Sequence, residues 1–483
     1  MNDTDVLIVG GGPTGLVLAL DLVRRGIRPR VIDRATEFFG GSRADGLLPR
    51  TQEVLADLGL IDTVLAEGDA GILVRGYQGD EEIWSGEFAE TVPPRPDVPY
   101  PNVWFLPQFR TEQLLRDQLA AHDVHVEQGT ELLGLTQDTD GVTATMRGGD
   151  RIRARYLVGA DGGRSTVRNL LGIRFDGETD DATTALFGDV RLTGLDRAHG
   201  RVWMSDSGIG VGLMPLAGSD LFTFTGPPPA DGEPTLAYLQ SVVDEATGRT
   251  DIVLREVTWA TVWRANARLA ERFHDNRVFL AGDAAHVCPP TGGQGMNTGI
   301  QDSYNLGWKL AAVLGGAPAE LLDSYAAERV PAAKTALALA TNLLAKHKRG
   351  DDDAHRRGPD LHQLTLNYRT SPLSTELRRA AGPVTAGDRA PDAPCQDTEG
   401  RATSLFQLCH GPHWTILTAE DATRYSVGRP DWPATTVVDT DGHIKAAYDI
   451  PPDTVVLIRP DGYIGMCAES TADLAPYLRR VTT

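Results

Sequence analysis

The chain has 483 residues, of which Lys and Arg contribute 46 and Asp and Glu 66, so its formal net charge is −20 at pH 7. This excess of acidic side chains repels a phosphate backbone, so we expect no sequence-independent binding to nucleic acid. The first residues lack the basic region and the small-residue cleavage site of a secretory signal, and no apolar run reaches the roughly 20 residues that span a bilayer. We therefore expect a cytoplasmic protein without a membrane segment.

The four cysteines, Cys288, Cys395, Cys409 and Cys467, form no Cys-x-x-Cys pair and have no histidine at the spacing of zinc ligands. We expect free, mostly buried thiols and no bound metal. At roughly 150 residues per domain, the length predicts about three or four structural units.

The N-terminal residues predict a strand, a glycine turn, a helix and a second strand. Residues 5–9 are an apolar run, Pro13–Arg25 has apolar residues at helical spacing, and Arg30–Asp33 again favours a strand. Between them stand Gly10, which makes the tight turn, Gly12, which lets the backbone approach a pyrophosphate, and Gly15, which lets helix and strand pack closely. Asp33 closes the second strand, where an acceptor for a ribose hydroxyl belongs. The pattern predicts a dinucleotide but does not separate FAD from NAD.

Further elements follow in chain order. Residues 111–121 are expected to be helical, residues 124–159 alternate as in an antiparallel meander, and residues 180–265 predict a second sheet. After a strand at 278–281 we expect a long helix from about Asn297 to Leu314 and a helical block over 319–347. The charged segment 348–358 is interpreted as a solvated loop and Gly382–Pro394 as a domain linker.

Two apolar strands end where an aspartate stands beside a glycine, at Asp161-Gly162 and at Gly282-Asp283. A carboxylate beside an unhindered backbone at the carboxyl end of a strand is typical of the edge where ligands bind in open α/β sheets. Together with the first glycine turn and the later glycine-rich loop, these steps predict a single flavin pocket.

On these motifs the chain resembles the class A flavoprotein aromatic hydroxylases, the para-hydroxybenzoate hydroxylase-like monooxygenases, over residues 4–347. The family's signatures match in order at Gly10-Gly11-Gly12-Pro13-Thr14-Gly15, at 161–165, and at 282–286 continuing through 295–297. The resemblance implies FAD as cofactor and NADPH or NADH as a transient co-substrate. No second Gly-x-Gly-x-x-Gly follows a strand, which agrees with the absence of a separate nicotinamide domain.

The resemblance also implies roles for individual residues. Asp33 would hold the adenosine ribose, Arg43 and Gln108 would contact the ribityl and pyrophosphate region, and Asp283 would bind a ribityl hydroxyl. Asp161-Gly162 is associated in the family with both FAD and nicotinamide binding. The expected cofactor-binding residues are Gly10, Gly12, Pro13, Thr14, Gly15, Asp33, Arg34, Arg43, Gln108, Asp161, Gly162, Asp283, Pro290, Gly295, Met296 and Asn297.

The loop 290–295 is expected to face the reacting ring of the flavin. Glycines before a helix leave backbone amides free and place the positive end of the helix dipole in front of a ligand. Donors from Gly295, Met296 and Asn297 would favour the reduced flavin anion and its peroxy adduct, in the manner of an oxyanion hole. No acid or base acting on the substrate is identified, and a loop that only caps the helix is the alternative. The flavin-facing residues are Pro290, Gly292, Gly293 and Gly295.

The family chemistry implies that NAD(P)H reduces the flavin, that oxygen forms a flavin hydroperoxide, and that its terminal oxygen passes to an electron-rich aromatic ring. We expect a phenolic or polycyclic aromatic substrate, such as an aromatic polyketide or an antibiotic. The sheet of residues 180–265 would line the substrate chamber, with Met214, Pro215, Phe222 and Phe224 as apolar walls. Core packing explains these residues equally well or better, and it is preferred for Trp259, Trp263, Tyr304 and Tyr325.

The C-terminal segment resembles the thioredoxin-like domain appended to phenol hydroxylases and polyketide hydroxylases, and it favours the polyketide hydroxylase branch. Without a Cys-x-x-Cys pair it has no disulfide exchange, so a structural role, or support of a homodimer, is preferred. Met466-Cys467 replaces an aromatic-basic pair that usually ends this domain.

The predicted fold class is therefore α/β, with a Rossmann-like FAD-binding domain of the glutathione reductase type, an inserted β-sheet substrate domain, a helical segment and a thioredoxin-like C-terminal domain. The predicted segments are 1–178 and 269–381 for the FAD-binding domain, 179–268 for the substrate domain and 382–483 for the C-terminal domain.

Several functions stay open on this scaffold. Baeyer-Villiger insertion or antibiotic inactivation would differ from hydroxylation only in how the substrate lies against the flavin. A flavin-dependent halogenase requires a Trp-x-Trp-x-Ile-Pro block, which Trp259-Ala-Thr-Val-Trp263 does not match. A non-catalytic flavin-binding redox sensor would hold FAD without substrate-stimulated NAD(P)H oxidation.

Overall fold

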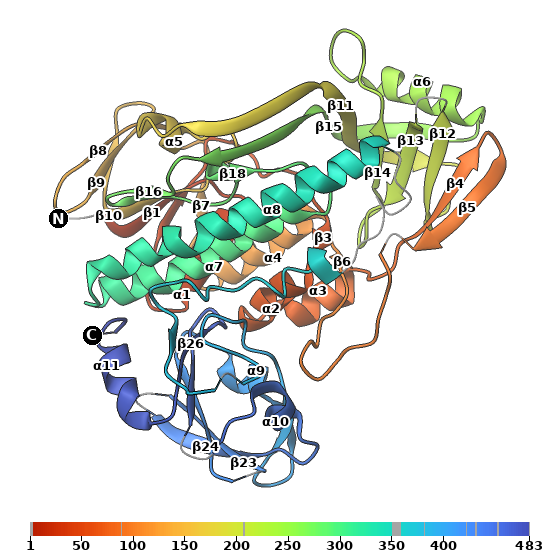
Figure 1. Ribbon diagram of the computed structural model, residues 1–483. Coiled ribbons are helices and arrows are strands. Elements are labelled where there is room, and N and C mark those ends of the chain that lie inside the picture. Colours follow the sequence, from red (N-terminus) through yellow and green to blue (C-terminus); the bar gives the residue numbers. More distant parts are fainter. Residues whose placement is uncertain are drawn as a thin grey trace.

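Three large β-sheets organise the residues that the computed structural model describes (Figure 1). These residues are 3–87, 89–205, 208–349, 359–380, 382–421, 423–429, 432–451 and 454–482. Most of the predicted solvated loop at 348–358 lies outside them. The mixture of parallel sheet, antiparallel sheet and long helices confirms the predicted α/β class.

The first sheet carries the glycine turn. Its strands run in the order β16-β17-β10-β1-β2-β7, and β1 pairs in parallel with both β10 and β2. Val9, at the end of β1, pairs with Gly159 and with Ile32, so three strands end side by side at one edge. The bounds are β1 Thr4–Val9, β2 Arg30–Ile32, β7 Val126–Glu127, β8 Leu132–Gln137, β9 Val142–Met146, β10 Arg151–Gly159, β16 His274–Asp275 and β17 Val278–Leu280.

The predicted meander over 124–159 is correct for β8, β9 and β10, which are antiparallel neighbours. It is wrong for β7, which pairs in parallel with β2 at the edge of the sheet. The alternating pattern of a half-buried strand does not reveal the direction of its partner, because that direction depends on the connection between them.

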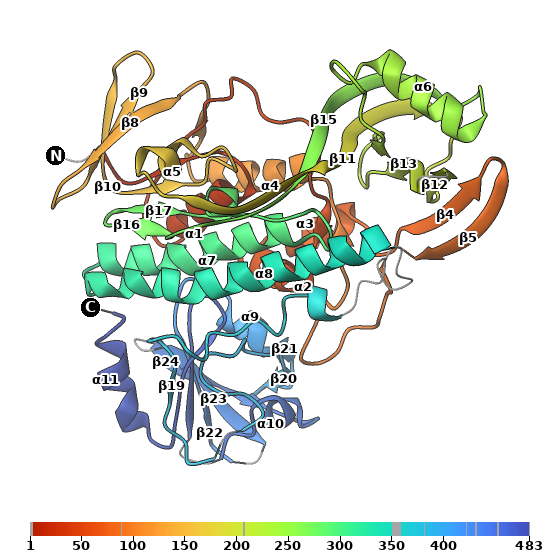
Figure 2. The same ribbon diagram turned by 45° about the horizontal axis from the view of Figure 1, so that its top comes forward.

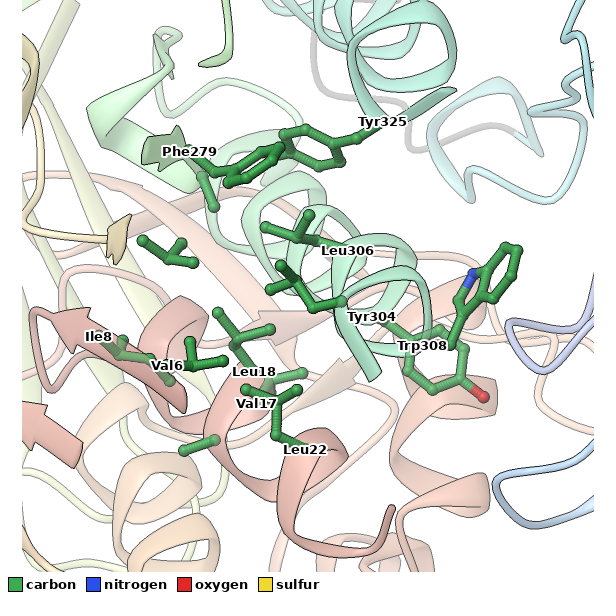
Figure 3. Close-up of a cluster of buried hydrophobic side chains, with 14 of the residues drawn as sticks. Val6, Ile8, Val17, Leu18, Leu22, Phe279, Tyr304, Leu306, Trp308 and Tyr325 are labelled. Carbon is green, nitrogen blue, oxygen red and sulfur yellow. The ribbon is translucent and has the colours of Figure 1, made fainter. Parts of the chain in front are cut away.

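Helices cover the first sheet and separate it from the C-terminal domain. α1 (Pro13–Val23) and α4 (Gln108–Ala120) match the predicted helices, and α7 (Gln294–Leu314) lies beside α8 (Asp323–Arg349) across the middle of the molecule (Figures 1 and 2). Tyr304 and Tyr325 are buried in the core between these helices and the sheet (Figure 3), which confirms their interpretation as packing residues. Shorter helices are α2 Pro49–Asp57, α3 Ile61–Glu67 and α5 Thr166–Leu170, with 3-10 turns at Gly282–Ala284, Ala319–Leu322 and Pro359–Leu361.

The second sheet has the order β18-β15-β11-β14-β13-β12-β4-β5. Its long strands β11 (Phe175–Thr193) and β15 (Val253–Ala270) run from the FAD-binding region into the substrate region (Figure 1). β4 (Leu73–Gln78) and β5 (Glu81–Glu87) come from the predicted first FAD-binding segment but complete the edge of this sheet. The remaining strands are β12 Gly200–Ser205, β13 Gly208–Pro215, β14 Phe222–Gly226 and β18 His286–Val287, while β3 Gly46–Leu47 and β6 Trp104–Phe105 form a separate pair.

One face of the second sheet is covered by α6 (Leu236–Thr247), a helix that the sequence analysis did not predict within 180–265. Its apolar residues Leu239, Val242 and Val243 are buried against the sheet. They occupy one side of a short helix between strands, where an apolar pattern of this length is easily assigned to a strand.

The third sheet forms the C-terminal domain, in the order β19-β26-β25-β22-β23-β24-β20-β21. The apolar stretches at 415–417 and 436–438 lie within β22 and β24, and residues 455–458 form β25. Met466 and Cys467 are completely buried in β26. The bounds are β19 Thr375–Glu376, β20 Pro394–Asp397, β21 Ala402–Ser404, β22 Thr415–Ala419, β23 Arg424–Arg429, β24 Trp432–Val438, β25 Val455–Ile458, β26 Ile464–Ala468, α9 Leu405–Cys409, α10 His443–Tyr448 and α11 Leu474–Leu478.

A buried ion network joins the C-terminal domain to α7 and α8. Arg459 donates to Glu328 of α8 at 2.7 and 2.9 Å and to Asp461 at 3.0 and 2.5 Å. Lys309 of α7 also donates to Glu328, at 2.7 Å. The apolar core of the FAD-binding region continues through Trp414, Val455 and Met466 into the C-terminal domain. The two regions are therefore packed as parts of one interior.

The four cysteines are free, and Cys395 and Cys467 are buried, as predicted. Among the described residues, no helix combines the length and the apolar character that a membrane crossing requires.

Candidate active site

The first glycine turn has the geometry that its three glycines predict. Gly10 has a φ of +116°, and a Cβ atom there would lie 2.2 Å from the backbone oxygen of Ala160. A Cβ on Gly15 would lie 2.0 Å from the backbone oxygen of Gly10, so helix and strand approach as closely as glycine allows. Gly12 caps α1 without a side-chain hydrogen bond, and a Cβ there would meet no atom within 4 Å. The backbone of this turn is therefore open on the side of the helix N-terminus.

Asp33 stands at the end of β2, as predicted, and holds the turn in place. Its Oδ2 accepts from the backbone N–H of Gly11 at 2.7 Å, and its Oδ1 accepts from the N–H of Ala35 at 2.8 Å. The side chain is only half-buried. Its carboxylate can therefore accept further hydrogen bonds from a ligand while it orders the glycine turn.

A cavity of about 520 Å³ extends from this turn across the first sheet. It brings together residues from several elements that are far apart in the sequence. Its lining includes predicted residues from the glycine turn, the end of β2, the loop after it, the start of α4 and the end of β10: Gly10, Gly12, Asp33, Arg34, Arg43, Gln108, Asp161 and Gly162.

Asp161 contributes to the cavity mainly by fixing backbone. Its carboxylate accepts from the Ser165 hydroxyl at 2.5 Å and from the N–H groups of Thr166 at 2.6 Å and Val167 at 3.1 Å, so it caps α5. Burial raises the pKa of this carboxyl, against the lowering effect of these donors. Gly162, which follows with a φ of +80°, leaves the cavity wall free of a side chain.

The Gly282-Asp283 turn is held by a buried carboxylate that the sequence analysis missed. Asp302 of α7 accepts from the N–H of Gly282 at 3.0 Å, from His286 Nε2 at 2.6 Å and from Arg329 Nε at 2.7 Å. Burial opposes ionisation, but His286 and Arg329 together hold the pKa of Asp302 below its ordinary value. Thr14 packs against this turn, because a Cβ on Gly282 would lie 2.5 Å from its Oγ1.

The side chain of Asp283 is exposed to solvent on this turn, but many protein atoms also surround its carboxyl group and reduce its solvation. Burial of the site raises the pKa of its carboxyl, while the charges of His286 and Arg43 act in the opposite direction. Arg43 lines the cavity and is also near enough to Asp283 for its charge to act on that carboxyl. A ligand that reached from the cavity to Asp283 would pass this arginine.

The glycine-rich loop leads into α7 at Gln294, three residues before the predicted start at Asn297. Gly292 and Gly293 have φ values of +84° and +64°, and no side chain caps the helix at Gly293. The Asn297 side chain instead donates to the Gly46 and Gly293 carbonyls and accepts from the N–H of Leu48. Its amide group thus ties the first turn of the helix to the 46–48 segment.

The remaining predicted residues of this region differ in exposure. Pro13 is the first residue of α1, Pro290 is exposed, and Gly295 and Met296 are partly exposed in the first turn of α7. Cys288, within the same loop, is in the neutral thiol form, because burial raises its pKa to about 12.

The predicted substrate-binding residues fall on both faces of the second sheet. Phe222 and Phe224 are buried in the core shared with α6, which supports their interpretation as packing residues. Met214 pairs with Thr223 and therefore lies on the opposite face, over Gly200. Pro215 lines a second cavity, of about 620 Å³, together with Arg197 and His199.

In the second sheet, Asp189 was missed and Trp259 was interpreted only as a packing residue. Asp189 is completely buried in β11 and accepts from Trp259 Nε1 at 2.5 Å and from the N–H of Ser42 at 2.6 Å. Its signal in the sequence is an acidic residue inside the short apolar stretch from Ala185 to Val190. Trp259 contacts a loop of the FAD-binding region, which its interpretation as a packed sheet residue did not anticipate.

The residues around the first cavity fit FAD. The open backbone at Gly12 and the free N-terminus of α1 suit a pyrophosphate. Asp33 provides an acceptor for a ribose hydroxyl, and the guanidinium groups of Arg34 and Arg43 offer positive charge along the same cavity.

Comparison with known proteins gives consistent results. Residues 3–340 match the family model described as FAD binding domain, and residues 384–483 match the model described as aromatic-ring hydroxylase, C-terminal. A flavin-dependent monooxygenase of Mycobacteroides abscessus is 42% identical, with 99% of both chains covered. A rifampicin monooxygenase of Streptomyces venezuelae is 36% identical, with 97% of both chains covered. The solved ternary complex of aklavinone-11 hydroxylase with FAD and aklavinone has a TM-score of 0.82 at 28% identity, covering 100% of this chain and 99% of that one.

Proposed function

The chain belongs to the FAD-dependent aromatic-ring hydroxylases, and from this membership we propose that its substrate is a polycyclic aromatic molecule of the polyketide or antibiotic type. It is an FAD-dependent monooxygenase that uses NAD(P)H and O2 to hydroxylate an aromatic substrate. When bound, the flavin supplies the activation of O2 and the transfer of oxygen to the ring. The residues of the chain bind the flavin, orient it and exclude water.

The cavity beside the glycine turn is the single observation that carries the proposed binding mode. Gly12 and the N-terminus of α1 would hold the pyrophosphate, and Asp33 would accept from the adenosine ribose. Arg43 and Gln108 would contact the middle of the cofactor, and Asp283 would bind a ribityl hydroxyl. Asp161 would act indirectly, by fixing the backbone beside Gly162.

The uncapped N-terminus of α7 completes this proposal. The amides of Gly295 and Met296 would donate to the pyrimidine side of the ring, where the reduced flavin carries negative charge. Gly293, where a Cβ atom would meet no atom within 4 Å, leaves this approach sterically open. The substrate would lie between the ring and the second sheet, on the face that carries Met214 and not on the α6 face that buries Phe222.

A second candidate function is oxidation that inactivates an antibiotic. The similarity to the rifampicin monooxygenase over nearly the whole chain favours it, and the same scaffold would perform Baeyer-Villiger insertion if the substrate presented a carbonyl to the flavin. The reactions are distinguished by their products, because hydroxylation keeps the ring system and insertion expands or opens a ring.

The test begins with the purified chain. A yellow protein with bound FAD is expected, and NADPH or NADH consumption should increase when phenols, naphthacenequinones or ansamycin naphthoquinones are added. Products are identified by mass and by nuclear magnetic resonance. Failure to bind FAD would overturn the assignment, whereas FAD binding without any substrate-stimulated NAD(P)H oxidation would favour a flavin-binding sensor.

We further propose a cytoplasmic enzyme that forms a homodimer. The absence of a Cys-x-x-Cys pair supports a structural role for the C-terminal domain within such an assembly. Light scattering during size-exclusion chromatography measures the mass of the assembly and tests the dimer.

A further inference from the structure

The loop of residues 40–45 contacts the second sheet at one short stretch. Residues 34–38 and Arg43 are exposed, but Gly41 and Ser42 between them are buried. Gly41 lies against the ring of Trp259, and a Cβ atom on Gly41 would lie 1.8 Å from Cδ1 of that ring. Only glycine therefore allows the loop to lie this close to the sheet.

Asp189 forms the polar half of the same contact. The N–H of Ser42 and the indole N–H of Trp259 both donate to its Oδ2, at 2.6 and 2.5 Å. Its Oδ1 makes no hydrogen bond of normal geometry among the described residues, although the hydroxyl of Thr223, its cross-strand partner in β14, is close enough to lower the pKa of the carboxyl. A buried carboxylate with one oxygen unsatisfied is destabilising compared with an apolar or amide side chain, so packing alone does not account for it.

Asp189 also lies in the cross-strand row that faces the proposed substrate chamber. Trp259 of β15, Asp189 of β11, Thr223 of β14 and Met214 of β13 are successive partners across the sheet. Paired residues of antiparallel strands point to the same face, so this row lies opposite α6. A substrate lying on Met214 would therefore contact the row that contains Asp189.

The other end of the loop reaches the proposed flavin site. The Ser42 hydroxyl accepts from the N–H of Gln108 at 3.0 Å, and the N–H of Arg43 donates to Gln108 Oε1 at 3.3 Å. The Arg43 side chain lines the cavity, and its charge acts on Asp283. Two residues of one loop thus connect the sheet face, the start of α4 and the cofactor cavity.

We propose that Asp189 is a positioning residue that clamps the 40–45 loop onto the second sheet. By holding this loop, it couples the binding of substrate on that sheet to the position of Arg43 at the flavin. The inference rests on the proposed function for the location of FAD and substrate. Among the described residues, Asp45 of the same loop is the charged group whose charge also acts on Asp189. Burial raises the pKa of Asp189 to about 6, which agrees with a carboxylate kept at an energetic cost.

The first test measures the clamp without catalysis. Trypsin cleaves after arginine, so the appearance of the peptide that ends at Arg43 reports release of the loop in the full-length protein, with and without FAD. Losing the charged acceptor of two hydrogen bonds should increase the population of the opened loop about tenfold. We therefore expect about tenfold faster cleavage in D189L. The increase should be smaller in D189N, which keeps an acceptor oxygen. G41A should resemble D189L, because it breaks the same contact sterically while leaving the carboxylate in place.

G40A provides the matched control for cleavage, because a Cβ on Gly40 meets no atom within 4 Å. It should be cleaved at the wild-type rate. Thermal unfolding and FAD content identify any variant that has lost its fold, and G41A keeps the test decisive if D189L misfolds. Equal cleavage rates in D189L, G41A and G40A would overturn the clamp.

The second test measures the coupling. The rate of flavin reduction by NADPH is followed with and without an aromatic substrate, and the ratio of the two rates is compared between variants. We expect the ratio to fall about tenfold in D189L and G41A, with partial recovery in D189N. A variant that only destabilised the fold would lower both rates and leave their ratio unchanged, which would overturn the coupling.

The two tests separate this inference from the proposed function. If the wild-type enzyme shows no substrate-stimulated NADPH oxidation, the proposed function fails, and the cleavage rates still decide whether Asp189 holds the loop. If the wild type is stimulated and D189L is stimulated equally, the proposed function stands and the coupling is refuted.

Discussion

Replacing Arg459 with methionine is expected to destabilise the contact between the C-terminal domain and the long helices. The guanidinium makes two hydrogen bonds to Glu328 and two to Asp461, and the three side chains are at most 1% exposed. Methionine is unbranched and apolar, so R459M removes the charge while still filling much of the space. Glu328 keeps Lys309 as a cationic partner, but Asp461 keeps only neutral side-chain donors from α7.

The magnitude follows from the two buried carboxylates that lose their shared cation. Removing one partner of a buried ion pair costs about 3–5 kcal/mol, because it leaves uncompensated charge in the interior. Burial opposes ionisation of Glu328, but Arg459 and Lys309 hold its pKa below the ordinary value. A depressed carboxyl pKa stabilises the native state above the unfolded value and loses that effect as pH falls. The loss of stability in R459M should therefore be fully present above about pH 4.5, the ordinary pKa of a glutamate, and decrease as the pH falls below that value.

Urea unfolding followed by tryptophan fluorescence measures this change, because Trp308 and Trp414 lie edge to face at this contact with ring centroids 5.5 Å apart. A chain of several domains need not unfold in one step, so the transition compared is the one that changes the interface fluorescence. R401M is the matched control in the same domain, since Arg401 is 72% exposed and pairs with Asp397 at the surface. Equal midpoints for R459M and R401M would refute the role assigned to the network.

Three further predictions concern the cofactor and substrate regions. G15A should abolish FAD retention on purification, because the added Cβ would lie 2.0 Å from a backbone oxygen, whereas G86A, which meets no atom within 4 Å, should retain the wild-type flavin content. D283A should weaken FAD binding about tenfold in a fluorescence titration, since a charged acceptor is lost, and an unchanged dissociation constant would remove this assignment. Because burial raises the pKa of Asp189 from 3.8 to about 6, with Asp45 facing it, the native state keeps a proton that the unfolded chain has released. As the pH rises from 3.8 to 6, the free energy of unfolding of the wild type should therefore fall by about 3 kcal/mol relative to that of D189N. Urea titration at a series of pH values measures this difference, and parallel pH profiles of the two proteins would contradict the assignment.

Much of the local geometry of the candidate cofactor site could be predicted because it is encoded within short segments. Gly10 and Gly15 are required by backbone approaches within a few residues of the turn or against the neighbouring strand, so their spacing alone indicates the geometry. Asp33 is placed by the strand that precedes it. The family resemblance then distinguished FAD from NAD, which the glycine spacing alone did not.

The residues that hold the site together could not be predicted in the same way. Asp302 and Arg329 are separated by a turn and lie on different helices, and Asp189 meets Ser42 from 147 positions away in the chain. Nothing in the local pattern of an α-helix or a strand specifies such a partner. The sheet faces were also ambiguous, because Met214 and Phe222 are both apolar and only the register of β13 and β14 places them on opposite sides.

Two buried carboxylates flank the cavity region, and they differ in the charge of the groups that donate hydrogen bonds to them. Asp302 is compensated by Arg329 and His286 and fixes the Gly282 turn, so this turn is rigidly held. Asp189 has no cation among its hydrogen-bond donors, and it holds the loop that carries Arg43. Because an ion-paired contact is harder to open than a contact made by an incompletely satisfied carboxylate, movement at the site should be concentrated on the Arg43 side. Because Arg43 would contact the middle of the cofactor, the asymmetry favours a rigid Gly282 turn and an adjustable contact between the 40–45 loop and the bound flavin.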